Sequence, residues 1–338
     1  MALKIGVVGA TGAVGRKMIE VLAERMLTDV SLRFFASKKS AGSFLVYRGK
    51  KIIVEELTEE VMKEKFDYLI FSAGSSVSKQ YAPIAKDAGN TVIDNSSYWR
   101  MEKNIPLVVP EVNAHVLEDY KGIIANPNCS TTQMLVVLAP LHRKYRMKRV
   151  VVSTYQAVSG SGQAAIEELE NQLIDKDHPN KVYTKKIAGN CIPHIDVFYK
   201  NGFSKEELKM VYETHKILED NTIEINATAV RVPVTSGHSE SVYIEFDNVV
   251  DKEGITKILS ESPGIVVIDD LSKNQYPTPL EIVGTDSTYV GRIRSDLYNK
   301  KAISLWIVAD NLRKGAATNA VQIIEAMENI IKKEHNYV

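Results

Sequence analysis

The stretch that decides the fold lies at the start of the chain, where residues 4–15 read KIGVVGATGAVG. The apolar residues of Lys4–Val8 predict a buried strand, and the spacing of apolar side chains over Val14–Arg25 predicts a helix. Three glycines, Gly9, Gly12 and Gly15, follow the strand in the spacing GxxGxxG, and the last of them lies at the start of the helical pattern. Glycines at such a junction allow a tight turn and let a pyrophosphate approach the N–H groups that open the helix. The sequence therefore predicts a dinucleotide-binding turn here; the alternative is a tight turn without a ligand.

Short strands separated by helical patterns continue through the first hundred residues. Ser31–Ala36, Tyr68–Ser72 and Thr91–Asp94 are strand-like segments of this kind. Strands that alternate with helices are typical of a parallel, doubly wound sheet. We therefore expect an α/β, Rossmann-type domain at the N-terminus.

The pattern changes near residue 148, where strand-like segments become longer and helices fewer. These segments are Arg149–Thr154, Ala227–Val234, Ser241–Phe246 and Ile303–Asp310. They predict a second, α+β domain on a mostly antiparallel or mixed sheet. A helix is expected over Glu206–Leu218 with Ser204 as its N-cap, and an amphipathic helix over Lys314–Lys333 is expected to pack on the first domain. The N-terminal domain then comprises residues 1–127 and 313–338, and the second domain residues 128–312.

The end of the second strand bears on the choice between NAD and NADP. An acidic residue there binds the ribose 2′-hydroxyl of NAD, whereas a cationic side chain accommodates the 2′-phosphate of NADP. In this chain the strand runs into Ser37-Lys38-Lys39-Ser40, without an acidic residue. We predict NADP as the cofactor; the alternative is a solvated basic loop.

Composition narrows the classes of partner. The chain has 338 residues with Lys+Arg and Asp+Glu both at 42, so its formal net charge is zero. A neutral chain gives no reason to expect nucleic acid or an acidic membrane surface as partner. We see no signal peptide and no apolar stretch of membrane-spanning length, and two cysteines are too few for a disulfide framework. We expect a cytoplasmic protein that acts on a small molecule.

One of the two cysteines, Cys129, has the surroundings of a nucleophile. It lies in ANPNCSTT, residues 125–132, immediately before the helical run Gln133–Leu141. A helix N-terminus lowers the pKa of a thiol and offers N–H donors to an oxyanion. The other cysteine, Cys191, has no comparable neighbours and is interpreted as structural.

A nucleophilic cysteine needs a base, and His238 is the best candidate. It lies in RVPVTSGHSES, residues 231–241, where we expect a Ser/Gly-rich turn after a strand to project the side chain into a cleft. The other histidines lie in helical, loop or terminal contexts, where packing or surface roles are the default. Clusters of His, Cys, Asp and Glu with metal-ligand spacing are not found, so we predict no metal site.

With these residues in place, the sequence resembles the aspartate-β-semialdehyde dehydrogenase family nearly from end to end. The resemblance rests on motifs that occur together along the chain. They are GATGAVG at 9–15, NSSYWR at 95–100, VPEVN at 109–113, NPNCSTTQ at 126–133, QAVSGSG at 156–162, ETHK at 213–216, RVPVTSGHSES at 231–241, PTP at 277–279, VGRIR at 290–294 and DNLRKGAA at 310–317. The chain is similar to the bacterial members of this family.

The resemblance implies reductive dephosphorylation of L-4-aspartyl phosphate to L-aspartate 4-semialdehyde and phosphate, reversibly, with NADPH and through a cysteine thioester. This reaction is the second step of the route to lysine (through diaminopimelate), threonine and methionine. The resemblance also implies a catalytic and dimerisation domain of the glyceraldehyde-3-phosphate-dehydrogenase-like kind, and a homodimer or a tetramer.

Roles for catalysis and substrate binding follow from the matching positions. The resemblance implies that Cys129 attacks the carbonyl carbon and that His238 is the general acid/base. Gln156 would orient the substrate beside the thioester. The substrate's α-carboxylate would be bound by Arg231, whose planar guanidinium suits a bidentate contact, and its amino group by Glu213.

Phosphate and cofactor contacts follow in the same way. The phosphate would meet Arg100, Lys216 and Asn128. Many family members carry arginine near the 2′-phosphate, whereas Lys38 and Lys39 supply charge without planar stacking. The implied cofactor contacts are Gly9, Thr11, Gly12, Ala13, Val14, Ser37, Lys38, Lys39, Ser40, Ser159, Gly160 and Asn311.

Three alternatives stay open at this point. An N-acetyl-glutamyl-phosphate reductase would use the same chemistry without needing Glu213, because its amine is acetylated. A glyceraldehyde-3-phosphate dehydrogenase relative carries a different cysteine segment, and neither enzyme matches RVPVTSGHSES as a unit. A non-catalytic NADP-binding sensor would lack the nucleophile or the base, whereas Cys129 and His238 are both present.

Overall fold

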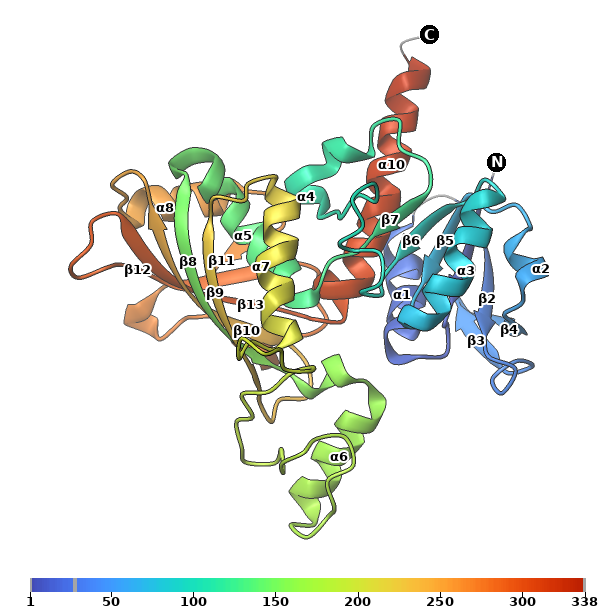
Figure 1. The fold of residues 1–338 in the computed structure, drawn as a ribbon, viewed down its shortest axis with the longest axis horizontal. Coiled ribbons are helices and arrows are strands. Elements are labelled where there is room, and N and C mark those ends of the chain that lie inside the picture. Colours follow the sequence, from blue (N-terminus) through green and yellow to red (C-terminus); the bar gives the residue numbers. More distant parts are fainter. Residues whose placement is uncertain (1, 27–28, 337–338) are drawn as a thin grey trace. The chain divides into compact units, whose positions relative to one another are not determined.

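The chain divides into two compact units, each described here by itself. Unit 1 comprises Met1–Pro127 and Ala316–Val338, and unit 2 comprises Asn128–Gly315. The computed structural model describes residues 2–26 and 29–336. Figure 1 labels most of the helices and strands of both units.

Unit 1 is built on a seven-stranded sheet with the strand order β3-β4-β2-β1-β5-β6-β7. Every neighbouring pair is parallel except β3 and β4, which confirms the predicted doubly wound α/β fold. Its elements are β1 Leu3–Val8, α1 Ala13–Arg25, β2 Val30–Ala36, β3 Phe44–Tyr47, β4 Lys50–Glu56, α2 Glu59–Met62, β5 Tyr68–Phe71, α3 Ser75–Asp87, β6 Thr91–Asp94, α4 Pro110–Asn113, a 3-10 turn Ala114–Leu117, β7 Ile123–Ala125 and α10 Thr318–Asn336.

Helices cover both faces of this sheet (Figure 1). Val7 packs in a buried cluster with Leu22 of α1 and Ile324 of α10. Its neighbour Val8 belongs to a second cluster, with Ala82 of α3. Successive side chains of a strand point to opposite faces, so a strand covered on both sides must be apolar throughout. This requirement explains the continuous apolar run that precedes the glycine turn.

Unit 2 is built on a six-stranded sheet with the order β11-β12-β13-β10-β8-β9. The pairs β11–β12 and β8–β9 are parallel and the other pairs are antiparallel, so the predicted mixed sheet is confirmed. Its elements are α5 Cys129–Tyr145, β8 Met147–Gln156, a 3-10 turn Val158–Ser161, α6 Gln163–Ile174, α7 Lys205–Leu218, β9 Glu224–Arg231, β10 His238–Phe246, α8 Lys252–Glu261, β11 Ile265–Val267, a 3-10 turn Leu271–Lys273, α9 Pro279–Ile282, β12 Thr288–Ser295 and β13 Ala302–Ala309.

Three helices of unit 2, α5, α7 and α8, lie along its sheet (Figure 1). The N-cap of α7 is Ser204, as predicted, and it forms a capping box with Glu207. The predicted C-terminal helix is present, and it starts with a π-helical turn over Arg313–Ala317 that runs directly into α10. In the described part of the chain, every helix is too short or too polar to cross a lipid bilayer.

Candidate active site

The glycine turn of unit 1 lies at the carboxyl end of β1, between its neighbours β2 and β5. Gly9 has φ 80°, and a Cβ there would lie 2.6 Å from the Ser72 carbonyl oxygen. A Cβ on Gly15 would lie 2.2 Å from the Gly9 carbonyl oxygen. A Cβ on Gly12, the N-cap of α1, would come no nearer than 3.4 Å to any atom. Packing therefore requires glycine at 9 and 15, while position 12 leaves the helix N-terminus open to a phosphate group.

The loop after β2 offers positive charge at the same edge of the sheet. Lys38 and Lys39 are exposed in a turn that the Ser40 N–H closes with a 2.8 Å hydrogen bond to the Ser37 carbonyl. The loop lies at the carboxyl end of β2, beside β1. The glycine turn fits a dinucleotide, and the two lysines place positive charge beside it.

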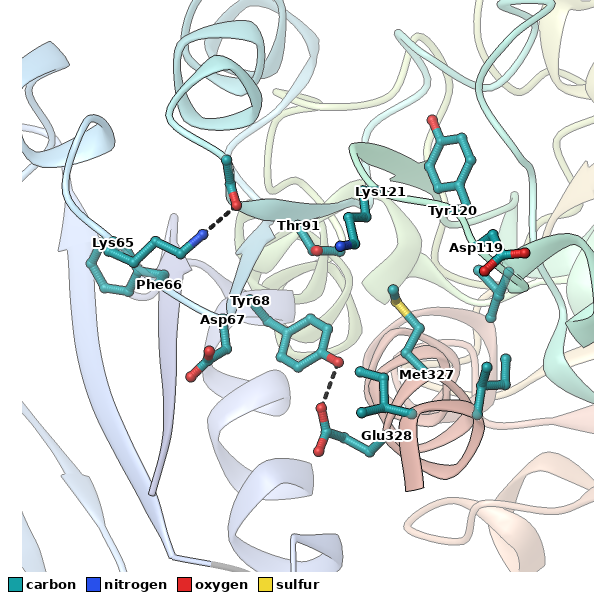
Figure 2. Close-up of a pocket in the computed structure, with 14 residues that line it drawn as sticks. Lys65, Phe66, Asp67, Tyr68, Thr91, Asp119, Tyr120, Lys121, Met327 and Glu328 are labelled. Carbon is teal, nitrogen blue, oxygen red and sulfur yellow. Dashed lines mark hydrogen bonds between the residues drawn. The ribbon is translucent and has the colours of Figure 1, made fainter. Parts of the chain in front are cut away.

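A separate surface pocket of about 550 Å³ lies at the opposite, amino end of β5 and β6 (Figure 2). Its polar groups are partly paired with one another. The Tyr68 hydroxyl donates to Glu328 Oε1 at 2.7 Å, and Lys65 Nζ donates to the Gly89 carbonyl. Its lining contains none of the residues predicted for the active site.

In unit 2, Cys129 is the first residue of α5, and Asn128 caps that helix. Asn128 Oδ1 accepts hydrogen bonds from Ser130 N at 3.0 Å and Thr131 N at 3.2 Å. Gly315, in the π-helical turn, lies against the cysteine, since a Cβ there would be 2.7 Å from Cys129 Cβ. Gly315 was not predicted as a site residue. Its only signal was its place in the DNLRKGAA motif.

Two carboxylates of α7, seven residues apart on one face, reach the cap of the cysteine helix. Asn128 N donates to Glu213 Oε2 at 2.7 Å, and Asn128 Nδ2 donates to Glu206 Oε1 at 2.8 Å. Both carboxylates are buried, and Lys209 Nζ lies 2.9 Å from Glu206 Oε2. Although burial opposes ionisation, the Lys209 ammonium and the amide donors lower the pKa of Glu206 to about 2. Sequence reasoning missed Glu206; its signal is the spacing of Glu206 and Lys209, which repeats that of Glu213 and Lys216.

Gln156 ends β8 beside the start of the cysteine helix. Its Nε2 donates to Ser130 Oγ at 2.9 Å and lies 3.3 Å from Glu206 Oε1. The side chain is 1% exposed. The network therefore joins β8, α5 and α7 at the residue that follows Cys129.

His238 is the first residue of β10 and not part of a turn, so its predicted setting is wrong. Gly237, with φ 90°, ends the turn one residue earlier, and His238 then pairs with Ala309 of β13. The imidazole is fully buried, and the Ala157 N–H donates to its Nδ1 at 3.0 Å. A neutral ring that accepts at Nδ1 carries its proton on Nε2. Burial and the Arg231 guanidinium lower the pKa of His238 to about 3, against an opposing influence of Glu206.

Arg231 and Gly160 border the imidazole. Arg231 ends β9, is 4% exposed, and its Nη1 donates to the Ala157 carbonyl at 2.6 Å. A Cβ on Gly160 would lie 3.1 Å from Arg231 Nη1 and 3.4 Å from His238 Nε2. Glycine at 160 therefore keeps open the space in front of both side chains.

Asn311 and Ser159, predicted to contact the cofactor, are hydrogen-bonded to each other. Asn311 Nδ2 donates to Ser159 Oγ at 3.0 Å, and Gly237 N donates to Asn311 Oδ1 at 2.9 Å. Asn311 thus fixes the turn that leads into His238. Both side chains are buried.

Unit 2 brings most of the predicted catalytic and substrate-binding residues into one connected network. Lys216 lies half-buried on α7, three residues after Glu213. Arg100 belongs to unit 1, where its Nη2 donates to the Asn95 carbonyl at 3.2 Å. Within residues 2–26 and 29–336, groups of three His, Cys, Asp or Glu side chains arranged to hold a metal ion are not found.

Comparison with known proteins identifies the family that shares this arrangement. A family model described as semialdehyde dehydrogenase, NAD binding domain, matches residues 4–120, and one described as semialdehyde dehydrogenase, dimerisation domain, matches residues 138–314. The aspartate-semialdehyde dehydrogenase of Aquifex aeolicus is 50% identical over 335 residues, covering 97% of this chain and 98% of the relative. The chain belongs to the aspartate-semialdehyde dehydrogenase family. The predictions of this family and of an oxidoreductase enzyme are confirmed.

Solved structures of aspartate-semialdehyde dehydrogenases share the fold. The Vibrio cholerae enzyme II, complexed with ASA, has a TM-score of 0.94 and 43% identity, covering 97% of this chain and 99% of that one. The Candida albicans enzyme with NADP has a TM-score of 0.77 and 26% identity, covering 98% of this chain and 100% of that one. The nucleotide-binding unit and the second, mixed-sheet unit are those of this family.

Proposed function

We propose that the chain catalyses NADPH-dependent reductive dephosphorylation of L-4-aspartyl phosphate to L-aspartate 4-semialdehyde, through a thioester on Cys129. The observation that carries this proposal is the buried network around Asn128, which joins the cysteine helix to Gln156 and Glu213. The Vibrio cholerae relative complexed with ASA supports the choice of substrate. In the cell this reaction serves the route to lysine, threonine and methionine.

The first half of the reaction forms the thioester. The Cys129 thiolate attacks the acyl carbon of aspartyl phosphate, and the positive end of the α5 dipole stabilises the tetrahedral oxyanion. Collapse of this adduct breaks the acyl–phosphate bond and releases phosphate. Since His238 accepts at Nδ1, its Nε2–H is a donor for the oxyanion, so its first role is hydrogen-bond donation.

The second half reduces the thioester. NADPH, when bound at the glycine turn, supplies the hydride. The carbon–sulfur bond then breaks, the aldehyde leaves and the thiolate of Cys129 is regenerated. The Nε2–H of His238 stabilises the oxyanion of this step as well.

Charged side chains are the proposed ligands of the substrate and of the phosphate. Arg231 binds the α-carboxylate and Glu213 binds the amino group, because a bidentate cation and a buried anion suit these groups. Lys216 and Arg100 bind the phosphate. Asn128 Nδ2 gives one hydrogen to Glu206 and has a second for a phosphate oxygen.

NADP, and not NAD, is the proposed cofactor. Exposed Lys38 and Lys39 follow β2 where an NAD enzyme carries an acid, and the Candida albicans relative is solved with NADP. The glycine turn, with Thr11, Ala13 and Val14, would hold the pyrophosphate. Ser159, Gly160 and Asn311 would contact the nicotinamide.

A homodimer through the sheet of unit 2 is the proposed assembly. Val151 and Tyr155 of β8 are each 37% exposed, and the Tyr155 ring lies 5.4 Å from that of Trp306 on β13. Apolar and aromatic side chains on an open sheet face are typical of an interface. Analytical ultracentrifugation of Tyr155→Lys, expected to shift toward monomer, tests this assembly against wild type.

The test of the reaction is NADPH formation from aspartate semialdehyde, phosphate and NADP. Activity must require phosphate and must exceed that with the acetylated glutamate semialdehyde, the substrate of the nearest rival. Cys129→Ser should reduce kcat on the order of 10⁴-fold, whereas Cys191→Ser, an exposed thiol, should leave it unchanged. Near-normal turnover by Cys129→Ser would show that the thioester mechanism is wrong.

A further inference from the structure

A buried carboxyl group outside the catalytic set lies beneath the thiol site. Glu240 is two residues after His238 on β10, and its side chain is fully buried. The two-residue spacing puts both side chains on one face of the sheet. Glu240 pairs in register with Thr154 of β8 and Ile307 of β13. Neither of these neighbours offers a positive charge to a carboxylate.

The side chain that faces Glu240 from α5 is Gln133. Burial raises the pKa of Glu240 well above its usual value, and a hydrogen bond with the Gln133 amide opposes this shift only in part. Gln133 Oε1 and both carboxyl oxygens of Glu240 lack a hydrogen-bond donor of normal geometry in the structure. Acceptors cannot satisfy one another, and leaving them buried without donors is costly. One proton on the carboxyl group turns it into a donor and removes the conflict.

We propose that Glu240 is a neutral carboxylic acid paired with the Gln133 amide, and that this pair positions the Cys129 helix against the His238 strand. The acid O–H donates to Gln133 Oε1, and the acid carbonyl accepts from Gln133 Nε2. Gln133 Nε2 also lies 3.4 Å from the His238 carbonyl oxygen. Glu240 is thus a positioning residue for the proposed reaction, on which this inference rests.

The helix geometry explains how the pair would act on the thiol. Gln133 lies four residues after Cys129, so both side chains lie on the same face of α5. Glu240 and His238 share a face of β10. The acid–amide pair therefore fixes the nucleophile and the imidazole through one cross-link between their two elements.

Removal of the acid tests the positioning role. Glu240→Leu should lower kcat about tenfold in folded protein with KM unchanged, because Gln133 loses its partner and the cysteine helix shifts. Val242→Ala is the matched control, since Val242 is buried two residues further along the same face. It should lower Tm and leave kcat unchanged. A Glu240→Leu protein that loses only Tm would overturn the positioning role.

Exchange of the two side chains tests the pairing itself. Glu240→Gln keeps a neutral hydrogen-bonding group and should retain kcat within about threefold. Gln133→Glu alone sets two carboxyl groups face to face and should lower kcat about 100-fold. The double variant Gln133→Glu/Glu240→Gln restores an acid–amide pair and should recover wild-type kcat within about threefold. The pair is refuted if the double variant is no better than Gln133→Glu alone.

Two measurements that use no substrate separate this inference from the proposed function. The difference infrared spectrum between wild type and Glu240→Gln should contain the carbonyl band of a protonated carboxylic acid at neutral pH. The rate of Cys129 alkylation should fall in Gln133→Glu and recover in the double variant. Absence of the band would show that Glu240 is not a neutral carboxylic acid. Absence of activity on aspartate semialdehyde, with the band and the alkylation pattern present, contradicts only the proposed function.

Discussion

The glycine turn of unit 1 and the thiol site of unit 2 are built from different parts of the chain. The glycine turn presents main-chain atoms of one short segment, and packing requires two of its three glycines. A Cβ at Gly15 would lie 2.2 Å from the Gly9 carbonyl oxygen, and one at Gly9 would lie 2.6 Å from that of Ser72. The thiol site uses buried side chains from α5, α7, β8, β9 and β10. A backbone site is specified locally, whereas a side-chain site is specified by strand register and helix packing.

The largest effects are expected where the backbone itself would have to move. Gly15→Ala places a Cβ 2.2 Å from the Gly9 carbonyl oxygen and 2.9 Å from Ala10 Cα, so unit 1 should lose about 3 kcal/mol or more of stability and its NADPH affinity. Gly12→Ala is the control, with its nearest atom at 3.4 Å. It should keep the Tm of wild type but weaken NADPH binding about tenfold. Thermal unfolding measures Tm, and fluorescence titration measures the affinity for NADPH. Equal Tm values for Gly15→Ala and Gly12→Ala would show that packing does not require glycine at position 15.

In unit 2 the largest expected effect comes from a change of side-chain shape at constant charge. Arg231→Lys keeps the positive charge but removes the planar guanidinium group. The 2.6 Å hydrogen bond from Nη1 to the Ala157 carbonyl is lost as well. We expect KM for aspartate semialdehyde to rise about 100-fold, equivalent to about 3 kcal/mol of lost hydrogen bonding to charge. Arg149→Lys, on the exposed part of β8, should leave KM unchanged. A KM for Arg231→Lys within about twofold of wild type would remove Arg231 from the substrate site.

The contrast also explains which features could be predicted from the sequence. The parallel sheet and the cysteine at a helix start follow from local patterns, namely apolar runs, glycines and a capping asparagine. The hairpin of β3 and β4 was missed, although Arg48 and Gly49 form its turn with φ values of 47° and 77°. The strand β3 forms the edge of the sheet, and both strands are half exposed, so their apolar signal is weak.

The local signals of the unpredicted site residues do not distinguish a site residue from a structural one, for a physical reason. Glu206 stands in the first turn of α7, where acidic residues are favoured whatever their function. Its role depends on packing of α7 against the cap of α5. Gly315 is required by Cys129, a residue remote in sequence, and Glu240 faces Gln133 only because β10 lies under α5. Register and packing of this kind are not encoded in any one segment.

The pH dependence of stability tests the buried imidazole of His238 in the thiol site. The pKa of His238 is about 3 in the folded protein and 6.5 in an unfolded chain. Between these values the unfolded state binds a proton that the folded state does not, so the stability present above pH 6.5 is lost as pH falls toward 3. The loss from pH 7 to pH 5 should be about 2 kcal/mol smaller in His238→Gln than in wild type.

Denaturant unfolding at both pH values measures this difference. The remaining histidines and carboxyl groups are common to both proteins, so their contributions cancel in the comparison. Parallel stability curves for His238→Gln and wild type would mean that the folded and unfolded imidazoles take up a proton over the same pH range. The lowered pKa of His238 would then be wrong.

The smallest expected effect belongs to the exposed lysines of unit 1. Lys38→Ala and Lys39→Ala each remove one charge-assisted contact to a 2′-phosphate, so KM for NADPH should rise about tenfold with kcat unchanged. KM for NADH should stay the same, because NADH lacks that phosphate. Lys50→Ala, an exposed lysine on β4, is the matched control and should change neither value. Raising the salt concentration should reduce the difference between wild type and the two variants, since exposed charges are screened. A parallel rise in KM for NADH would assign the lysines to the shape of the loop, and the site in unit 1 would then depend on the backbone alone.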